Sequence, residues 1–202
     1  MLNTTSTINH ALTHSKIELL APSIFQSAPQ GHLSKRYNFI PTIALVKEME
    51  KLGWLPVRAV ETKVRDEQNN GYQKHMVRFR NFDESVNRQL AVGDNFIEIV
   101  MTNSHNGLSS FIFSLGLFRL ACSNGMVVSE SYFDTVQIKH SSYDARNVIE
   151  YCGKIVDTAP QVINTVHQME AIELSPQEQL TFANAAKILR FDNPQNVLKL
   201  SP

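Results

Sequence analysis

The sequence predicts an α+β fold: an antiparallel sheet with a long basic hairpin, helices packed on one face, and a C-terminal helical segment. Residues 54–128 are dominated by period-two alternation of apolar and polar side chains, interrupted by turn sequences. Apolar residues at helical spacing precede this region and return after residue 142. The order helix, strands, helices is typical of helices packed on one sheet face.

Three parts are expected along the chain. Residues 1–36 combine a polar head with a short apolar segment broken by Pro22, and this pattern predicts a mobile N-terminal extension. Residues 37–140 form the predicted α+β core, and residues 141–202 are expected to be C-terminal helices that pack on it. At 202 residues and 43% hydrophobic content, the chain can bury one substantial core.

The first helix is predicted from Thr42 to Leu52. Leu45, Met49 and Leu52 recur at helical spacing, Thr42 is a candidate N-cap, and Gly53 is placed to end the helix. Alternation over 54–65 and 72–80, joined by a turn at residues 68–71, then predicts the long hairpin. Further extended segments are predicted at 96–102, 108–113 and 117–128.

Two Asn-Gly pairs interrupt the later extended segments. Asn106-Gly107 and Asn124-Gly125 each predict a sharp reversal, because Asn-Gly tolerates positive φ at consecutive turn positions. Polar residues around these pairs most simply make turn hydrogen bonds, and they are also candidates for a functional role. These possible functional turn residues are Asn103, His105, Arg119 and Asn124.

The C-terminal part has helical periodicity. Apolar residues between Val148 and Met169 fall three or four positions apart on one stripe, and Pro160 is expected to kink or divide that helix. Ser175-Pro176-Gln177-Glu178 is a capping box with proline in the favoured first turn, and it predicts a last helix to about Arg190.

Charge is balanced overall and segregated locally. The 19 basic and 19 acidic residues cancel, so nucleic-acid or membrane binding requires a local patch. Residues 57–80 contain six Lys or Arg against three acids, which is the pattern of a phosphate-contacting strip and equally of an ordinary solvated sheet face. The candidate nucleic-acid-binding residues are Lys63, Arg65, Lys74, His75, Arg78 and Arg80.

Cysteine chemistry is an open alternative. Cys122 with His105 and Asn124 could form a nucleophile, base and orienting amide, yet a cysteine among apolar neighbours is more typical of a buried, unreactive residue. Cys122 and Cys152 form no Cys-x-x-Cys pair, so neither a disulfide framework nor a metal site is expected. No phosphate-binding loop or dinucleotide fingerprint is present, so no cofactor is expected. The absence of a secretory or membrane-spanning apolar run predicts a cytoplasmic protein.

Several blocks of the sequence resemble one family. They are Arg36-Tyr37-Asn38-Phe39-Ile40-Pro41-Thr42, Thr62 to Arg65, Lys74-His75-Met76-Val77-Arg78, Asn103-Ser104-His105-Asn106-Gly107, Gly116-Leu117-Phe118-Arg119 and Cys122-Ser123-Asn124-Gly125. On these blocks the chain resembles the phage and plasmid family catalogued as domain of unknown function 932, over about residues 20–190. The resemblance implies a mobile genetic element in a bacterial cytoplasm, and it implies no settled activity.

The layout also resembles that of phage and mitochondrial single-strand annealing proteins, which assemble into rings or filaments around single strands. This likeness implies a non-enzymatic, homo-oligomeric protein that binds single-stranded nucleic acid during replication or recombination. Two alternatives stay open: a protein-interaction or anti-defence factor that binds a host protein, and a cysteine-dependent enzyme. A continuous basic groove would favour nucleic acid, and an accessible Cys122 beside His105 would favour catalysis.

Overall fold

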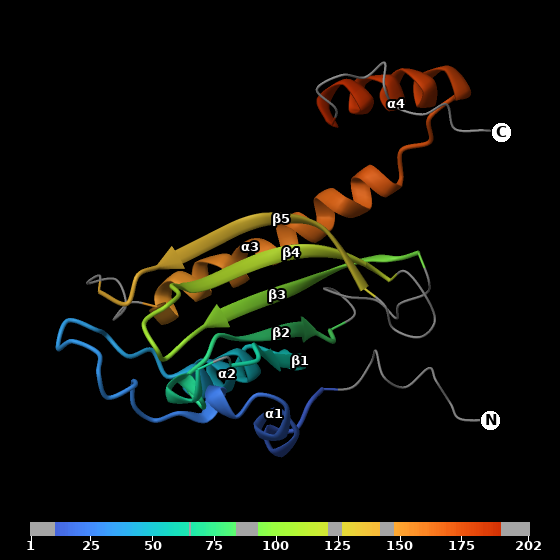
Figure 1. The fold of residues 1–202 in the computed structure, drawn as a ribbon. Helices are drawn as coiled ribbons and strands as arrows, with labels where there is room; N and C mark the ends of the chain where they lie inside the picture. The colour runs from blue at the N-terminus through green and yellow to red at the C-terminus, as the bar shows by residue number, and fades with distance from the viewer. Residues whose placement is uncertain (1–10, 65, 84–92, 121–126, 142–147, 191–202) are drawn as a thin grey trace, which may run out of the picture. The chain divides into compact units, whose positions relative to one another are not determined.

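The computed structural model describes residues 11–64, 66–83, 93–120, 127–141 and 148–190. Within these ranges one antiparallel sheet has the strand order β1-β2-β3-β4-β5, so each strand lies beside its neighbours in the chain (Figure 1). The strands are β1 (Trp54–Glu61), β2 (His75–Asn81), β3 (Asn95–Asn103), β4 (Phe111–Leu120) and β5 (Val127–Ile138). The helices are α1 (His14–Leu20), α2 (Thr42–Lys51), α3 (Val148–Glu170) and α4 (Pro176–Arg190), with short 3-10 helices η2 (Pro22–Phe25) and η3 (Glu67–Asn69). The predicted α+β fold is confirmed.

The chain divides into two compact units, residues 1–163 and 164–202. The first unit contains the sheet, α1, α2 and most of α3. The second contains the end of α3 and all of α4. The division therefore falls inside α3, more than 20 residues beyond the boundary expected at residues 140 and 141.

Alternate residues of the sheet build the core of the first unit. Val77 of β2 pairs with Met101 of β3, which pairs with Phe113 of β4, and all three are buried on one face. Apolar residues of α2 and α3, among them Met49 and Ile155, belong to the same buried cluster. Helices α2 and α3 therefore cover one face of the sheet, as the sequence predicts.

The N-terminal segment corrects the prediction of a mobile extension. Ile17 of α1 and Ile24 of η2 are completely buried and belong to the core cluster. The backbone N–H of Leu12 donates to the carbonyl of Pro56 in β1, at 2.6 Å. Residues 11–25 are thus part of the first unit's core, because a short apolar segment broken by a proline can still bury its side chains.

The helices follow their sequence signals with one exception. Helix α2 spans nearly the predicted range, and Gly53 follows it with a φ of 81°. Helix α3 continues through Pro160, which the sequence predicted would kink or divide it, over 23 residues. Its buried residues include Ala159 immediately before the proline and Ile163 after it, so the helix is packed on the core on both sides of Pro160.

The later strands differ from the predicted segments. Strand β4 runs unbroken through the predicted gap between residues 113 and 117, and β5 extends ten residues past the predicted end at residue 128. The side chains of residues 132–135 are exposed, so this part of β5 carries no apolar alternation for a pattern search to find.

Of the two predicted Asn-Gly reversals, one is described. Gly107 has a φ of 75°, but no described non-glycine residue has positive φ, so Asn106-Gly107 is not a two-residue hairpin. It lies inside a seven-residue connection, Ser104 to Ser110, between β3 and β4. Asn124-Gly125 lies outside the described residues.

Helix α4 begins at the predicted capping box. The Ser175 backbone N–H and hydroxyl both donate to Glu178 Oε2, at 2.9 and 2.6 Å. No residue of α4 is buried. Within the range 141–202, which was expected to pack on the core, Val148, Ile155 and Ile163 of α3 belong to the core cluster of the first unit. Among the helices in the described ranges, none is long and apolar enough to cross a membrane.

Candidate functional site

Three buried histidines lie together at one end of the sheet. His75 opens β2, His105 follows β3, and His140 follows β5. Their side chains are 1%, 0% and 6% exposed. The ring centroids of His75 and His105 lie 4.9 Å apart, and Tyr37 stacks on His140 at 4.5 Å. Three segments far apart in the chain therefore meet through their histidines.

Asn103, the last residue of β3, organises this cluster. Its amide nitrogen donates to the Ile40 carbonyl and to Thr42 Oγ1, both at 3.0 Å. Its amide oxygen accepts the Ser104 backbone N–H at 2.8 Å and faces His140 Nε2 at 3.0 Å. The Ile40 carbonyl can only accept a hydrogen bond and the Ser104 N–H can only donate one. Only one orientation of the Asn103 amide meets both requirements, so the positions of its oxygen and nitrogen are fixed.

Thr42 connects the other two histidines. Its hydroxyl lies 2.8 Å from His75 Nε2 and 3.4 Å from His105 Nε2. His75 Nδ1 donates to the Gln73 carbonyl at 3.0 Å, so Nε2 of the neutral ring is an acceptor and receives the Thr42 proton. His105 Nε2–H then donates to Thr42, which leaves His105 Nδ1 as a buried lone pair without a hydrogen-bond partner.

Burial sets the protonation of these rings. It lowers the pKa of His75 to about 4, against a smaller opposing effect of the Gln73 carbonyl. Burial, with a smaller effect of the positive charges that His75 and His140 would carry, lowers the pKa of His105 to about 3. Both rings are therefore neutral near pH 7, in agreement with the hydrogen-bond pattern.

The network holds the connection Ser104 to Ser110 against the end of the sheet. The Tyr37 hydroxyl donates to the Ser104 carbonyl at 2.9 Å, and the His105 backbone N–H donates to the Tyr72 carbonyl at 2.9 Å. Leu108, at the tip, is 77% exposed. Buried histidines thus support an exposed loop.

Two hollows lie on either side of this loop and share Leu108 and Ser109 as lining. The Lys74 hollow, of about 260 Å³, also contains Lys63 and a carboxylate, Asp66. The remaining polar lining residues of the Lys74 hollow are Thr62, Asn69, Gln73 and Asn106. Lysine with amide and hydroxyl donors is a set suited to a phosphate group.

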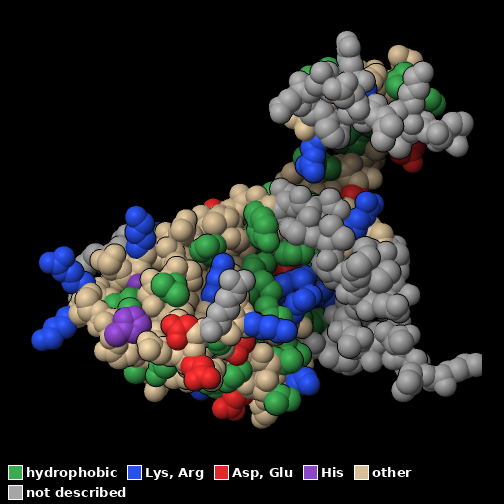
Figure 2. Space-filling model, in the orientation of Figure 1, with side chains coloured by type: hydrophobic (Ala, Val, Ile, Leu, Met, Phe, Trp, Pro, Cys, Tyr) green, Lys and Arg blue, Asp and Glu red, His purple; other side chains and the backbone are tan. Residues whose placement is uncertain are grey.

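The second hollow, here the Lys139 hollow, has a volume of about 290 Å³. Besides the shared Leu108 and Ser109, its lining residues are Tyr37, Gly107, Ser110, Lys139, His140 and Ser141. Lys35 and Arg36, both exposed, immediately precede Tyr37. Figure 2 shows Lys and Arg side chains at this end of the sheet, with Asp and Glu side chains close by.

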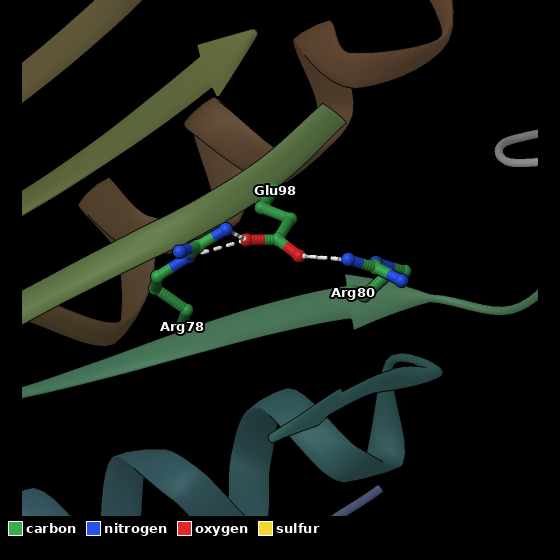
Figure 3. A network of polar contacts seen from close by, with 3 residues as sticks. All are labelled: Arg78, Arg80 and Glu98. Atoms are coloured by element: carbon green, nitrogen blue, oxygen red, sulfur yellow. Dashed lines mark hydrogen bonds and ion pairs between the residues drawn. The ribbon is translucent and has the colours of Figure 1, made fainter. Parts of the chain in front are cut away.

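The opposite face of the sheet corrects the expected basic strip. Arg78 and Arg80 point away from the helices, as predicted, but they are only 9% and 4% exposed. Both guanidinium groups donate to Glu98, whose side chain is completely buried (Figure 3). Their charges are used inside the protein and do not form a solvated phosphate-binding strip.

The other predicted site residues are dispersed. Lys63 and Lys74 are exposed and lie together in the Lys74 hollow, whereas His75 is buried in the histidine network. Arg119 lies within β4, exposed, and donates to the Gly93 carbonyl at 3.1 Å, so it is not a turn residue. Arg65 and Asn124 lie outside the described residues.

No contact among the described residues supports the alternative of a cysteine-dependent enzyme. Cys122 lies outside the described residues, and His105 is completely buried and hydrogen-bonded to Thr42. Burial raises the pKa of the Cys152 thiol to about 12, as expected for an inert core cysteine. In the described ranges, no group of three His, Cys, Asp or Glu residues is arranged to hold a metal ion.

Sequence reasoning missed Thr42, His140 and Lys139 as site residues. Thr42 was interpreted as a helix cap, but its hydroxyl joins the histidines. His140 and Lys139 follow the part of β5 that lacks apolar alternation. One sequence signal could have identified Thr42. It lies with Tyr37 in one block of the family resemblance, and Asn103 to Gly107 form another block of the same resemblance.

The first unit is thus a five-stranded antiparallel meander with α2 and α3 packed on one face and a polar loop supported by buried histidines. The family model described as "Domain of unknown function (DUF932)" matches residues 29–197, and the chain belongs to this family. It is 33% identical over 180 residues to "UPF0380 protein YfjQ" and, equally, to "UPF0380 protein YafZ", both of Escherichia coli (strain K12). Each match covers 89% of this chain and 63% of the relative, so the chain spans less than two thirds of these relatives' length. No solved structure matches the chain.

Proposed function

We propose that this chain is a nucleic-acid-binding protein that contacts the phosphate backbone at the end of the sheet bearing the two hollows. The observation that carries the proposal is their adjacency: the Lys74 hollow and the Lys139 hollow share Leu108 and Ser109. A phosphodiester strand presents anionic groups at regular intervals, so neighbouring basic hollows fit consecutive parts of one strand.

The chemistry of the lining supports a sequence-independent contact. Lysines provide charge, and serine hydroxyls and Asn or Gln amides provide donors, and all of these groups can bind phosphate oxygens whatever the base sequence. Exposed Leu108 supplies an apolar surface between the hollows, against which an unpaired base can lie. This combination favours single strands over a duplex, in which the bases are already stacked.

The proposal extends to biological context. The protein would act without covalent chemistry, as a homo-oligomer in a bacterial cytoplasm, in replication or recombination of a mobile element. Repetition of a small basic site around an oligomer would let a chain with no net charge bind a long strand.

One observation favours a second candidate, a protein-interaction factor that engages a host protein. Large apolar side chains of α4 are exposed, including Phe182 at 67% and Leu189 at 89%. Exposed apolar surface of this kind is typical of protein contacts. On this candidate, substitutions in α4 would remove function and substitutions in the two hollows would not.

The test is a binding titration of a fluorescent 20-nucleotide oligo-dT, as a single strand and as a duplex with oligo-dA, at several salt concentrations. The double variant Lys63→Gln/Lys74→Gln should bind the single strand more weakly and reduce the salt slope by about 1.4, since each lost contact lowers it by about 0.7.

The matched control is Lys47→Gln/Lys154→Gln, which removes the same net charge from exposed positions on α2 and α3. It should leave affinity and slope unchanged. Equal losses in the two double variants, or no binding by the wild-type protein at low salt, would overturn the proposal.

A further inference from the structure

Both ring nitrogens of His140 face carbonyl oxygens. Nδ1 lies 2.9 Å from the backbone carbonyl of Asn38, and Nε2 lies 3.0 Å from the side-chain carbonyl of Asn103. A backbone carbonyl can only accept a hydrogen bond. The amide of Asn103 is fixed by Ile40 and Ser104, so it also presents an acceptor to the ring.

Both ring nitrogens of His140 can donate hydrogen bonds to these oxygens in only one protonation state of the ring. A neutral histidine has one N–H and one lone pair, so one of the two nitrogens would direct its lone pair at an oxygen. The imidazolium has two N–H groups and satisfies both acceptors. His75 and His105 do not have two acceptors in this way. His75 Nε2 receives a hydrogen bond from the Thr42 hydroxyl, and His105 Nδ1 has no hydrogen-bond partner among the described residues.

On balance, the surroundings of His140 act against its charged state. Burial lowers its pKa, and the hydrogen bond to the Asn38 carbonyl opposes that effect. The titratable groups that face it are the stacked Tyr37 ring, neighbouring Lys139 in the hollow and His105 behind it. The described lining of the Lys139 hollow includes no carboxylate that could supply a countercharge.

We propose that the Lys139 hollow is a phosphodiester-binding subsite that takes up one proton at His140 when a phosphate occupies it. This inference rests on the proposed function. The bound phosphate supplies the missing negative charge beside Lys139, and a solvent proton completes the hydrogen bond between His140 and one of its two carbonyls. No covalent bond of the ligand forms or breaks, and the proton returns to solvent on release.

Proton uptake makes affinity depend on pH. Binding linked to one proton tightens as the pH falls, by at most tenfold per pH unit. The Lys74 hollow is lined by two lysines, the Asp66 carboxylate and uncharged side chains, with no histidine, so its contribution should not change between pH 8 and 6. The two hollows are therefore distinguishable by pH as well as by position.

Calorimetric titration of oligo-dT at pH 7, in buffers of different ionisation enthalpy, measures the proton uptake directly. An internucleotide phosphodiester does not titrate near neutral pH, so any uptake belongs to the protein. Wild-type protein should take up as much as one proton per bound chain and bind several-fold more tightly at pH 6 than at pH 8. Under saturating oligo-dT, the His140 ring nitrogens should show the ¹⁵N shifts of an imidazolium.

Variants assign the proton. His140→Gln should abolish the uptake, whereas His32→Gln, at an exposed position in the preceding loop, should leave it unchanged. Lys74→Gln should weaken binding at every pH and keep the uptake. Wild-type binding without proton uptake, or uptake that survives in His140→Gln, overturns this inference while the proposed function stands. Absence of oligo-dT binding at all pH values overturns both.

Discussion

Arg80 donates to Glu98 across neighbouring strands of the sheet, with Nη2 2.5 Å from Oε1. Arg78 binds the second oxygen of the same carboxylate. The two guanidinium groups also lie over aromatic rings, Arg78 over Phe118 and Arg80 over Phe96, each at 4.4 Å. Two cations thus share one buried anion. The aromatic faces attract the guanidinium charges and so offset part of the cost of burying them.

Glu98→Gln should destabilise the protein by about 3 kcal/mol or more, because it removes the buried negative charge to which both guanidinium groups donate. Urea unfolding measures the change. The control Glu48→Gln breaks an ion pair between Glu48 and Lys51 that is exposed to solvent, and it should cost less than about 0.5 kcal/mol. Similar losses in the two variants would contradict the buried-cluster interpretation.

Stability should fall with acidification as the pH drops below the ordinary histidine pKa of 6.5. The pKa values of His75 and His105 are lowered in the fold, so between pH 6.5 and about 4 the unfolded chain binds protons that the folded one does not. The stabilisation is complete above pH 6.5, and each ring removes up to about 1.4 kcal/mol per pH unit below it. His105→Gln should flatten the decline measured by urea unfolding at several pH values. His32→Gln, at an exposed position, should not.

Gly107→Ala should destabilise the protein by more than about 1 kcal/mol. A φ of 75° is strained for alanine, and the added Cβ would lie 2.7 Å from Leu33 Cδ2. Gly153→Ala is the matched control, because Gly153 is in α3 and nothing lies within 4 Å of its Cβ position. That change should stabilise the helix, by up to about 1 kcal/mol. The midpoints of thermal unfolding of the two variants measure the difference in stability. Equal midpoints would contradict the expectation.

Cys152 should be inert in the folded protein. Its thiol is buried and its raised pKa leaves almost no thiolate at pH 8. In a Cys122→Ser background it is the only thiol of the chain, so its reaction with an aromatic disulfide reagent reports on Cys152 alone. Labelling should be slow in buffer and fast in denaturant. Rapid labelling of the folded protein would show that this part of the core opens.

Leu189→Gln should leave the stability of the first unit unchanged, because Leu189 is 89% exposed and no residue of α4 is buried. Ile155→Ala, in the core half of α3, should cost about 2–5 kcal/mol. Chemical unfolding monitored at Trp54, the single tryptophan, which is buried, separates the two outcomes. A clear loss in Leu189→Gln would contradict the exposure of this side chain.

Local rules predicted the elements whose signals are local. Leu45 and Met49 marked α2, and Ser175 with Glu178 marked the start of α4. The functional interpretation of Arg78 and Arg80 was wrong about solvent exposure because their partner, Glu98, lies on another strand. Periodicity assigns a side chain to a face of the sheet but does not say what covers that face or which charge opposes it.

Several residues of the candidate site were singled out from the sequence, but the way they come together was not predicted, for the same reason. His75, His105 and His140 lie in three separate segments, and only the strand order of the sheet brings their ends together. His105 and Asn103 were singled out as turn residues, but the long-range bonds of Asn103 to Ile40 and Thr42 have no counterpart in local spacing.

The strand order has a consequence for how the chain folds. Each strand of the meander pairs with the strand that precedes or follows it, so the sheet can grow by successive hairpins without a crossover. The histidine network closes contacts of a different kind: Asn38 to His140 spans 102 residues, and Tyr37 to Ser104 spans 67. Because closing such long loops costs the most chain entropy, the loop end of the sheet should consolidate after the hairpins. Folding would then leave the proposed binding surface as the last part of the first unit to take shape.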